Sequence, residues 1–359
     1  MTSFDELRGE FPTGTGYLAA CTMGLGPASV RRALTDDLEL WGAGAAGAAG
    51  AERYEAAVAR GRSAFARLVH VAPSRVAIGS QASVQAALVA ASVPDGAEVL
   101  CVTGDFSSIA APFAQQAYRG VRLRQVALPA LAEAITARTW LVAFSLVQSA
   151  TGELADVEAV LEASARHGAR TLVDLTQSAG WLDFDARRAD VTITHAYKWL
   201  CAPRGVSLMT VSERMLRELR PVQAGWYAGQ DVWSSCYGAE LQLAADARRF
   251  DVSPAWQAWI GAAEALERFA AIELAEVAAH NVALGDELRT ALGLPRRHSA
   301  IVTWSDPAGR DLAALTATGL TASGRAGNAR VAFHLWNDER DVARIVDALH
   351  RARTLPSAA

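Results

Sequence analysis

The alternation of short apolar runs with amphipathic stretches constrains the fold of this chain more than any other feature. Through the first two thirds of the 359 residues, runs rich in Val, Ile and Leu are separated by stretches with helical periodicity. This rhythm is typical of an α/β fold with a mixed, mostly parallel sheet between helices. Strands are predicted at residues 76–78, 99–102, 123–126, 140–144, 171–173, 191–193 and 206–209, and helices at 83–91, 112–118 and 157–167.

The pattern changes after about residue 255. Residues 256–292 are rich in Ala, Leu and Glu with few helix breakers, which predicts a long helix joining two domains. A strand at 300–305, a helix at 311–318, a strand at 330–335 and a helix at 339–352 then indicate a smaller α+β C-terminal domain. We predict an N-terminal arm that joins the small domain (1–16), a large domain (17–265) and the small domain (266–359).

Composition and charge argue against several functional classes. The formal net charge is −4 and the Arg-Arg pairs are scattered, so no basic stripe predicts nucleic-acid binding. Residues 1–8 lack the basic and apolar regions of a signal peptide. The uncharged stretch 76–94 contains Ser80 and Gln81, and it is interpreted as a strand-to-helix unit rather than a membrane span. Four cysteines without a CxxC spacing predict a reduced, cytoplasmic protein with no metal site.

Lysine occurs only once in the chain. Lys and Arg together number 34, and all of them except Lys198 are arginine. Because a guanidinium keeps its proton in proteins, it cannot act as an amine nucleophile or form a Schiff base. Any chemistry that needs a side-chain amine must therefore come from Lys198. The alternative is that one lysine persists by chance, and its neighbourhood decides between the two.

A carboxylate and this lysine end two consecutive predicted strands. Asp174 closes the run at 171–173, Gln177 comes three residues later, and the run at 191–193 leads to Lys198. Polar residues at the carboxyl ends of strands face the ligand crevice of an open α/β sheet. A lysine that forms a Schiff base and a carboxylate that keeps a ring nitrogen protonated are what pyridoxal 5′-phosphate (PLP) needs. The sequence therefore predicts a PLP site at this edge of the sheet.

Two further features fit a PLP site. Small residues at 79–83 link a predicted strand to a predicted helix, and free amides at a helix N-terminus bind phosphate. Phe106 follows the strand at 99–102 and could stack on a pyridine ring, although an aromatic residue there could equally belong to the core.

The Gly/Ala segment 42–50 offers a different interpretation, a nucleotide-binding α/β protein, because it contains a GxGxxG match. The dinucleotide fingerprint requires a strand before the glycines and a helix that opens at them. Residues 30–41 predict a helix instead, so we interpret the segment as a low-complexity loop. A nucleotide-binding protein would hold no PLP and would be indifferent to Lys198→Ala.

Four segments, in chain order, resemble the class V aminotransferase superfamily of PLP fold type I, which includes cysteine desulfurases, kynureninases and isopenicillin N epimerases. They are Tyr17–Gly24 (YLAACTMG), Asp174–Gly180 (DLTQSAG), Tyr197–Gly205 (YKWLCAPRG) and Arg330–Glu339 (RVAFHLWNDE). The lysine segment is most similar to the epimerase-like and kynureninase-like branches. The resemblance covers almost the whole chain, and it implies a PLP cofactor, an amino-acid substrate and a homodimer with shared active sites.

The resemblance also implies a role for each matched residue. Lys198 would carry the Schiff base and shuttle protons, and Asp174 would pair with the pyridinium nitrogen. Arg330 would bind the substrate α-carboxylate, for which a planar guanidinium is well suited. The other implied cofactor-binding residues are Gln177 at the ring oxygen, Ser80, Gln81, Ala82, His195 and Tyr197 at the phosphate, Phe106 on the ring, Ser253 toward the partner's phosphate and Trp226 near the dimer seam.

Each of these residues also has an ordinary structural alternative. Asp174 could cap a helix, and Gln177 could be a first-turn residue. His195 could be a buried core histidine, and Arg330 one of many surface arginines. Taken together, these alternatives require the only lysine to fall among them by accident.

Two departures from the family pattern bear on the reaction. Ser149 stands where the family has an asparagine that contacts the cofactor oxygen. The loop 320–329 is short and lacks the nucleophilic cysteine of cysteine desulfurases, which disfavours a persulfide mechanism. The remaining chemistry needs only Lys198 as acid and base. We expect a class V aminotransferase; the alternatives are a β-eliminating lyase of the C–S lyase type, an amino-acid epimerase and a non-catalytic scaffold.

Overall fold

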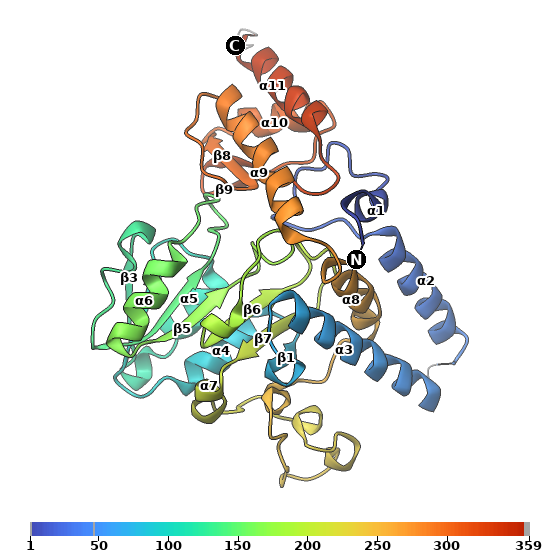
Figure 1. Cartoon of the computed structure of the whole chain (residues 1–359), viewed down its shortest axis with the longest axis vertical. Helices are drawn as coiled ribbons and strands as arrows, with labels where there is room; N and C mark the ends of the chain where they lie inside the picture. The colour runs from blue at the N-terminus through green and yellow to red at the C-terminus, as the bar shows by residue number, and fades with distance from the viewer. Residues whose placement is uncertain (1, 46, 355–359) are drawn as a thin grey trace.

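The computed structural model describes residues 2–45 and 47–354 of the chain. A large sheet consists of β1 (Val76–Gly79), β2 (Glu98–Val102), β3 (Arg122–Val126), β4 (Thr139–Ser145), β5 (Arg170–Asp174), β6 (Val191–His195) and β7 (Ser207–Val211). The spatial order is β1-β7-β6-β5-β4-β2-β3 (Figure 1). Pairs among β2, β3, β4, β5 and β6 are parallel, whereas β7 runs antiparallel to β1 and β6. The predicted mixed, mostly parallel sheet is confirmed.

Helices cover both faces of the large sheet. Successive side chains of a strand point to opposite faces, so Val76 and Ile78 belong to one hydrophobic core and Ala77 to another. The first core lies against α3 (Ala48–Leu68), α6 (Val157–His167) and α8 (Trp256–Phe269). The second lies against α4 (Ala82–Ser92), α5 (Ser107–Ala114) and α7 (Glu213–Glu218). Strands β5 and β6 are buried almost throughout, as parallel strands covered on both faces are.

Seven short 3₁₀ helices lie in the connections of the described chain. They are η1 (Pro73–Arg75), η2 (Ala117–Arg119), η3 (Leu128–Ala130), η4 (Ala186–Arg188), η5 (Trp226–Ala228), η6 (Trp233–Ser235) and η7 (Ala247–Phe250).

The helix predicted at 112–118 is displaced toward the N-terminus. The observed α5 begins at Ser107 and ends at Ala114, so Pro112 lies inside the helix and not at its start. Just before the helix, the Asp105 Oδ1 accepts a hydrogen bond from the backbone N–H of Phe106, the N-cap residue, and no side chain caps the first turn. This interaction positions Phe106 directly at the entrance to the helix.

The single long helix predicted at 256–292 is wrong, because the structure divides it into α8 and α9 (Leu274–Ala291). The intervening residues Ala270–Glu273 contain neither glycine nor proline. Here the carbonyl of Ala271 accepts a hydrogen bond from the backbone N–H of Thr2. A contact from the distant N-terminal segment therefore satisfies a carbonyl that a continuous helix would have used internally.

A second, three-stranded sheet forms the upper part of the molecule in Figure 1. It contains β8 (Ile301–Ser305), β9 (Ser323–Arg325) and β10 (Asn328–Ala332) in the order β8-β10-β9, with both pairings antiparallel. Helices α9, α10 (Arg310–Ala317) and α11 (Glu339–Thr354) pack on it around a separate core. We refer to this part as the small-sheet unit; it has the α+β composition predicted for the C-terminal region.

The N-terminal residues contact the small-sheet unit. The ring of Phe4 in α1 (Phe4–Gly9) lies 4.9 Å from that of His280 in α9, and the Gly16 amide donates to Asp341 in α11. Residues 17 and 19 form isolated bridges to 321 and 332. The boundary at residue 265 remains a prediction, and it falls within α8.

The GxGxxG segment connects two helices. Helix α2 (Ala28–Gly42) precedes it, and α3 begins at Ala48, while residue 46 lies outside the described residues. The segment therefore lacks the preceding strand on which a dinucleotide site depends.

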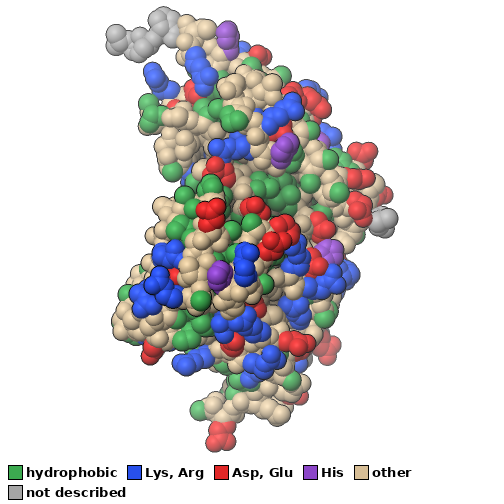
Figure 2. All heavy atoms as spheres, turned by 60° about the vertical axis from the view of Figure 1, so that its left-hand side comes forward, with side chains coloured by type: hydrophobic (Ala, Val, Ile, Leu, Met, Phe, Trp, Pro, Cys, Tyr) green, Lys and Arg blue, Asp and Glu red, His purple; other side chains and the backbone are tan. Residues whose placement is uncertain are grey.

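Across the residues that the structure describes, no helix combines the length and apolarity needed to cross a membrane. On the face drawn in Figure 2, acidic and basic side chains are interspersed.

Candidate active site

The carboxyl ends of β5 and β6 meet the N-terminus of α4 at a cavity of about 120 Å³. This convergence follows from the topology, because parallel neighbours end at the same edge of the sheet. The cavity brings together most of the residues predicted from the sequence. Its lining residues are Gln81, Ala82, Ser83, Phe106, Ser108, Asp174, Thr176, His195, Tyr197, Lys198 and Arg204.

Lys198 is buried in this cavity, with 5% of its surface exposed. Its Nζ lies 5.2 Å from the centroid of the Phe106 ring and 5.7 Å from that of Tyr197. Burial lowers the pKa of Lys198 to about 8, although the negative charge of Asp174 acts in the opposite direction. The amine can therefore lose its proton close to neutral pH, as a nucleophilic or basic lysine must.

Asp174 is a buried carboxylate at the end of β5. Its Oδ1 accepts a hydrogen bond from the Thr176 amide at 2.9 Å, and its Oδ2 lies 3.5 Å from the Ser145 hydroxyl. That hydroxyl donates more closely, at 2.6 Å, to Asp105. Burial raises the pKa of Asp174 to about 6, against the lowering effects of Thr176 and Lys198. A carboxylate of this kind fits a protonated ring nitrogen, which would supply a cation at hydrogen-bond distance.

Other residues that line the cavity offer groups for a phosphate. Helix α4 begins after Gln81 without a side-chain cap, so amides of its first turn face the cavity. The Nε2 atom of His195 is buried without a hydrogen-bond partner among the described residues, and its ring contacts that of Tyr197 at a centroid distance of 4.4 Å. Burial, Arg204 and Lys198 lower the pKa of His195 to about 4, so the ring is neutral at pH 7.

Arg204 also lines the cavity, although the sequence motifs assigned it no role. Its guanidinium lies 4.4 Å from the centroid of the Tyr197 ring and lines the cavity. An arginine beside an uncapped helix N-terminus is well suited to a phosphate dianion. Its position in the lysine segment, six residues after Lys198, was the available signal. Ser80 precedes this turn and does not line the cavity.

Arg330 lies in β10 of the small-sheet unit, and only 1% of it is exposed. It does not line the cavity, but it is near enough to Lys198 that its charge, after burial, contributes to the lowered pKa of that amine. Its guanidinium donates to the carbonyl and hydroxyl of Ser149, at 2.5 and 3.0 Å, and to the hydroxyls of Thr22 and Ser323, at 2.8 and 3.2 Å. All these partners are neutral, and no carboxylate of the described residues pairs with it. A buried cation without a counter-charge fits a ligand carboxylate.

Gln177 makes a set of contacts that the sequence did not indicate. Its Nε2 donates to the Cys21 carbonyl at 2.9 Å and to the Ser149 hydroxyl at 3.0 Å, while its Oε1 accepts from Trp199 Nε1 at 2.8 Å. It does not line the cavity. The hydroxyl of Ser149, the residue that departs from the family pattern, therefore accepts hydrogen bonds from both Gln177 and Arg330. A role for Gln177 at the ring oxygen remains a prediction.

Trp226 and Ser253 lie away from the cavity of their own chain. Trp226, in η5, packs on the rings of Tyr227 and Trp233. Ser253 is exposed between η7 and α8. Their place at a dimer seam remains a prediction.

Three of the four cysteines are fully buried, and Cys236 is half-buried. The Cys201 thiol lies next to the Trp199 carbonyl and the ring of His334. Burial raises the pKa of both Cys101 and Cys201. Such thiols are poor nucleophiles. Cys21 is near enough to Lys198 and Arg330 that its charge would influence the pKa of both.

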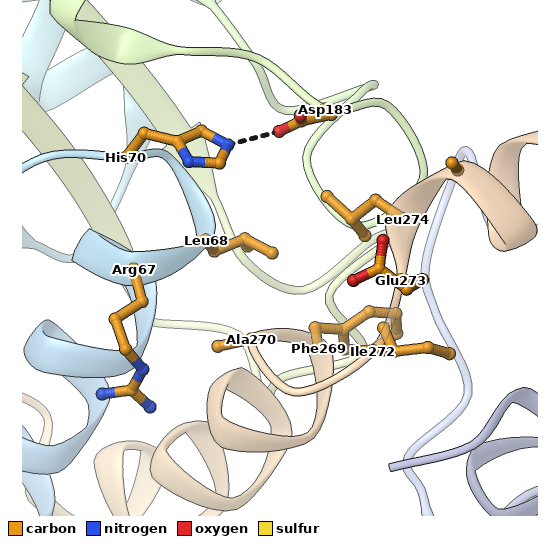
Figure 3. A pocket seen from close by; sticks show the side chains of 10 residues that line it. Arg67, Leu68, His70, Asp183, Phe269, Ala270, Ile272, Glu273 and Leu274 are labelled. Atoms are coloured by element: carbon orange, nitrogen blue, oxygen red, sulfur yellow. Dashed lines mark hydrogen bonds and ion pairs between the residues drawn. The ribbon is translucent and has the colours of Figure 1, made fainter. Parts of the chain in front are cut away.

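A larger cavity, of about 250 Å³, lies where α8 passes into α9, and it contains none of the predicted site residues. Figure 3 shows the ring of His70 pointing to Asp183, 2.6 Å away, above Phe269 and Ile272. The pair is partly exposed to solvent and links the α3 terminus to the loop after β5. Size alone therefore does not identify the chemical site in this protein.

Comparisons with known proteins show the family to which the chain belongs. Residues 26–323 match the family described as aminotransferase class-V. The isopenicillin N epimerase of Streptomyces clavuligerus is 27% identical over 335 residues, which cover 80% of this chain and 82% of the epimerase.

Two solved structures share the fold. The cysteine desulfurase CsdA of Escherichia coli has a TM-score of 0.84 at 19% identity and covers 98% of both chains. A C-DES variant with glycine covalently linked to the PLP cofactor has a TM-score of 0.86 at 21% identity, covering 97% of this chain and 99% of C-DES.

The fold and the site together define a PLP-dependent enzyme of fold type I. Within that class, the chain belongs to the class-V aminotransferase family, since the family match spans most of its length. The cofactor predicted from Lys198 and Asp174 is thereby confirmed.

Proposed function

We propose that the protein is an aminotransferase that acts on an amino acid, with Lys198 as the group that takes the α-proton. The observation that carries the proposal is a single buried amine of lowered pKa in the same cavity as Asp174 and Phe106. Arg330, which pairs with no carboxylate of the described residues, lies near enough for its charge to act on this amine. PLP, when bound, bonds to this amine and supplies an electron sink for the electron pair left on the substrate Cα.

The side chains around Lys198 have separate tasks. Asp174 holds a proton on the pyridine nitrogen through its negative charge. Arg204, His195 and the first amides of α4 bind the phosphate, and Phe106 lies against the ring. Arg330 orients the substrate by its α-carboxylate, so that the Cα–H bond faces the Lys198 amine.

Transamination needs one acid-base group, which moves a proton from the substrate Cα to the cofactor carbon that carries the amino nitrogen. Among the residues lining the cavity, Lys198 is the group whose pKa lies near neutral pH and which has no other task. His195, with a pKa of about 4, is a weak base, and Asp174 is needed at the ring nitrogen. The lining therefore supports a reaction with one base.

Epimerisation is the second candidate, because the relative with the longest match described above is an isopenicillin N epimerase. This reaction would require the proton to return to the opposite face of Cα. For this, either Lys198 alone would have to reach both faces of Cα, or a second acid would have to lie on the opposite face.

The test is the reaction of the holoenzyme with a panel of amino acids in D₂O without an oxo-acid acceptor. One turnover that leaves the cofactor in its amine form supports the aminotransferase. Many turnovers with an unchanged cofactor contradict it: release of pyruvate and a leaving group indicates a β-eliminating lyase, and deuterium at an inverted Cα indicates an epimerase.

We also propose that the enzyme is a homodimer with shared active sites. Exposed apolar side chains on α2 and in the segment from Val222 to Tyr237 support this, since such side chains favour burial in an interface. They are Leu38, Leu40, Trp41, Val222, Trp233 and Tyr237.

A further inference from the structure

The hairpin that carries Arg330 also carries a second arginine, Arg325, whose role the proposed reaction leaves open. Arg325 ends β9, is exposed, and donates one hydrogen bond to the carbonyl of its neighbour Gly324 at 2.7 Å. None of the carboxylates in the described chain forms an ion pair with it. The segment 320–329, expected to be a short loop, forms part of this hairpin, and it corresponds to the loop that in cysteine desulfurases carries the nucleophilic cysteine.

The register of the hairpin places Arg325 and Arg330 on one face. Ser323 pairs directly with Arg330, and Arg325 with Asn328. Directly paired residues share a face, as do residues two apart on one strand. The bonds from Arg330 to Ser149, which follows β4, and to Thr22 show that this face is turned toward the large-sheet side of the molecule. The two arginines are diagonal neighbours, whose Cβ atoms are about 7 Å apart in such pairs.

The turn of the hairpin fixes this arrangement. Ala326 and Gly327 both have positive φ, 50° and 75°, which is typical of the tight two-residue turn that joins antiparallel strands. A tight turn allows little slippage in register, so Arg325 is held immediately beside it. Figure 1 shows β9 at the lower edge of the small-sheet unit, the edge that faces the large sheet. Burial is the main cause that lowers the pKa of both Lys198 and Arg330, and the charge of Arg325 adds to this lowering, so Arg325 is near enough to act on both groups.

In the proposed complex, the charged groups of the cofactor and the α-carboxylate of the substrate all have partners of opposite charge, but Arg325 has none. The phosphate lies at Arg204, the ring nitrogen pairs with Asp174, and the α-carboxylate binds Arg330. A substrate with a neutral side chain would therefore place no anion near Arg325. An anionic group on the side chain of the substrate would complete the pairing.

We propose that Arg325 determines specificity by binding an anionic side-chain group of the substrate, so that the enzyme prefers acidic amino acids to neutral ones of equal size. This inference rests on the proposed function. Arg325 is a substrate-binding residue in this scheme and takes no part in proton transfer. The anion can be a carboxylate, a sulfonate or a phosphate, because a guanidinium binds each of them.

The test compares isosteric substrates on the holoenzyme by titrating the cofactor spectrum. L-aspartate and L-glutamate are compared with L-asparagine and L-glutamine, and L-cysteate and L-phosphoserine distinguish sulfonate and phosphate from carboxylate. We expect at least one acidic amino acid to bind about tenfold or more tightly than its neutral counterpart. The Arg325→Gln variant should lose that ratio, and Arg325→Lys should keep part of it.

Arg351→Gln is the matched control, because it removes one exposed positive charge from α11 of the same unit. Its ratio of acidic to neutral affinity should equal that of the wild type. A wild-type enzyme without acidic preference, or an Arg325→Gln variant with an unchanged ratio, overturns the inference while the reaction itself stands. If no amino acid changes the cofactor spectrum, the proposed function falls and the inference falls with it.

Discussion

At the scale of single residues, the burial of Lys198 has a direct kinetic consequence. An amine must lose its proton before it can attack the cofactor aldehyde, and burial lowers the pKa of this one from 10.5 to about 8. The rate at which the apoenzyme captures PLP should therefore rise with pH and level off above about 8. Stopped-flow absorbance measures this rate at pH values from about 6 to about 10.5, a range that includes the pKa of an ordinary lysine. A midpoint near 10 would mean that the amine is not desolvated.

Lys198→Ala is the control for that experiment. Since the chain contains no other lysine, the variant should hold no cofactor that borohydride can fix to a side chain. Fixation that persists in the variant would place the covalent site elsewhere.

Arg330 should affect substrate far more than cofactor. In Arg330→Lys the charge remains, but the planar pair of donors is lost, and we expect the affinity for amino acids to fall about 100-fold, in line with the loss of charge-assisted hydrogen bonds. The affinity for PLP should change little, and both are read from the cofactor spectrum. Equal losses for PLP and amino acid in a folded variant would mean that the α-carboxylate binds elsewhere. Arg351→Lys, on exposed α11, serves as the control.

Some of these residues could be predicted from the sequence for physical reasons. Asp174 and Lys198 end neighbouring buried strands, and the topology alone brings them together. Arg204 lies on a loop whose path depends on tertiary contacts. Its spacing from Lys198 in the sequence therefore does not show whether its side chain faces the cavity. The contacts of Gln177 depend on Ser149 and Cys21, which are distant in sequence and have no pattern of their own.

At the scale of secondary-structure elements, one buried ion pair holds β1 to the segment that leads into α8. Arg62 of α3 and Asp251 are joined at 2.6 Å, and Asp251 also accepts the Ile78 amide at 2.7 Å. Removing one partner leaves a buried charge unpaired, so Asp251→Ala should lower the free energy of unfolding by about 3–5 kcal/mol. Urea denaturation measures this change.

Asp95→Ala provides the comparison, because Asp95 pairs with Arg119 at the surface and its side chain is 77% exposed. Its effect should stay within about 1 kcal/mol. Similar losses in both variants would show that the Arg62–Asp251 pair contributes no more than an exposed one.

The elements differ in how well a sequence can indicate them. Strands β5 and β6 are short apolar runs buried on both faces, and a continuous apolar run predicts a strand of this kind. The division between α8 and α9 has no local signal, because the Thr2 amide that binds the Ala271 carbonyl comes from the other end of the chain. The start of α5 at Ser107 likewise has no local signal, because no side chain caps its first turn.

At the scale of the whole molecule, the proposed site requires both sheets. In this proposal the large-sheet part supplies Lys198 and Asp174, and the small-sheet unit supplies Arg330 through β10. The hydrogen bonds from Arg330 to Ser149 and Thr22 cross between these parts. Substrate binding at Arg330 would therefore also stabilise the relative position of the two sheets.

The proposed dimer extends this argument to a second chain. Ser253 is exposed and lies outside the cavity of its own chain, so any contact it makes with a phosphate has to be with that of the partner. Ser253→Asp should then repel the phosphate and weaken PLP binding in the homodimer. In a heterodimer of Ser253→Asp and Lys198→Ala chains, the first chain has an intact Lys198 and receives an intact serine from the second. One site of each heterodimer should thus regain covalent PLP, which absorbance after reassembly measures. If Ser253 acts within its own chain, neither site of the heterodimer regains covalent PLP. Sedimentation of the enzyme at the mass of one chain would contradict the dimer itself, and with it the shared active site.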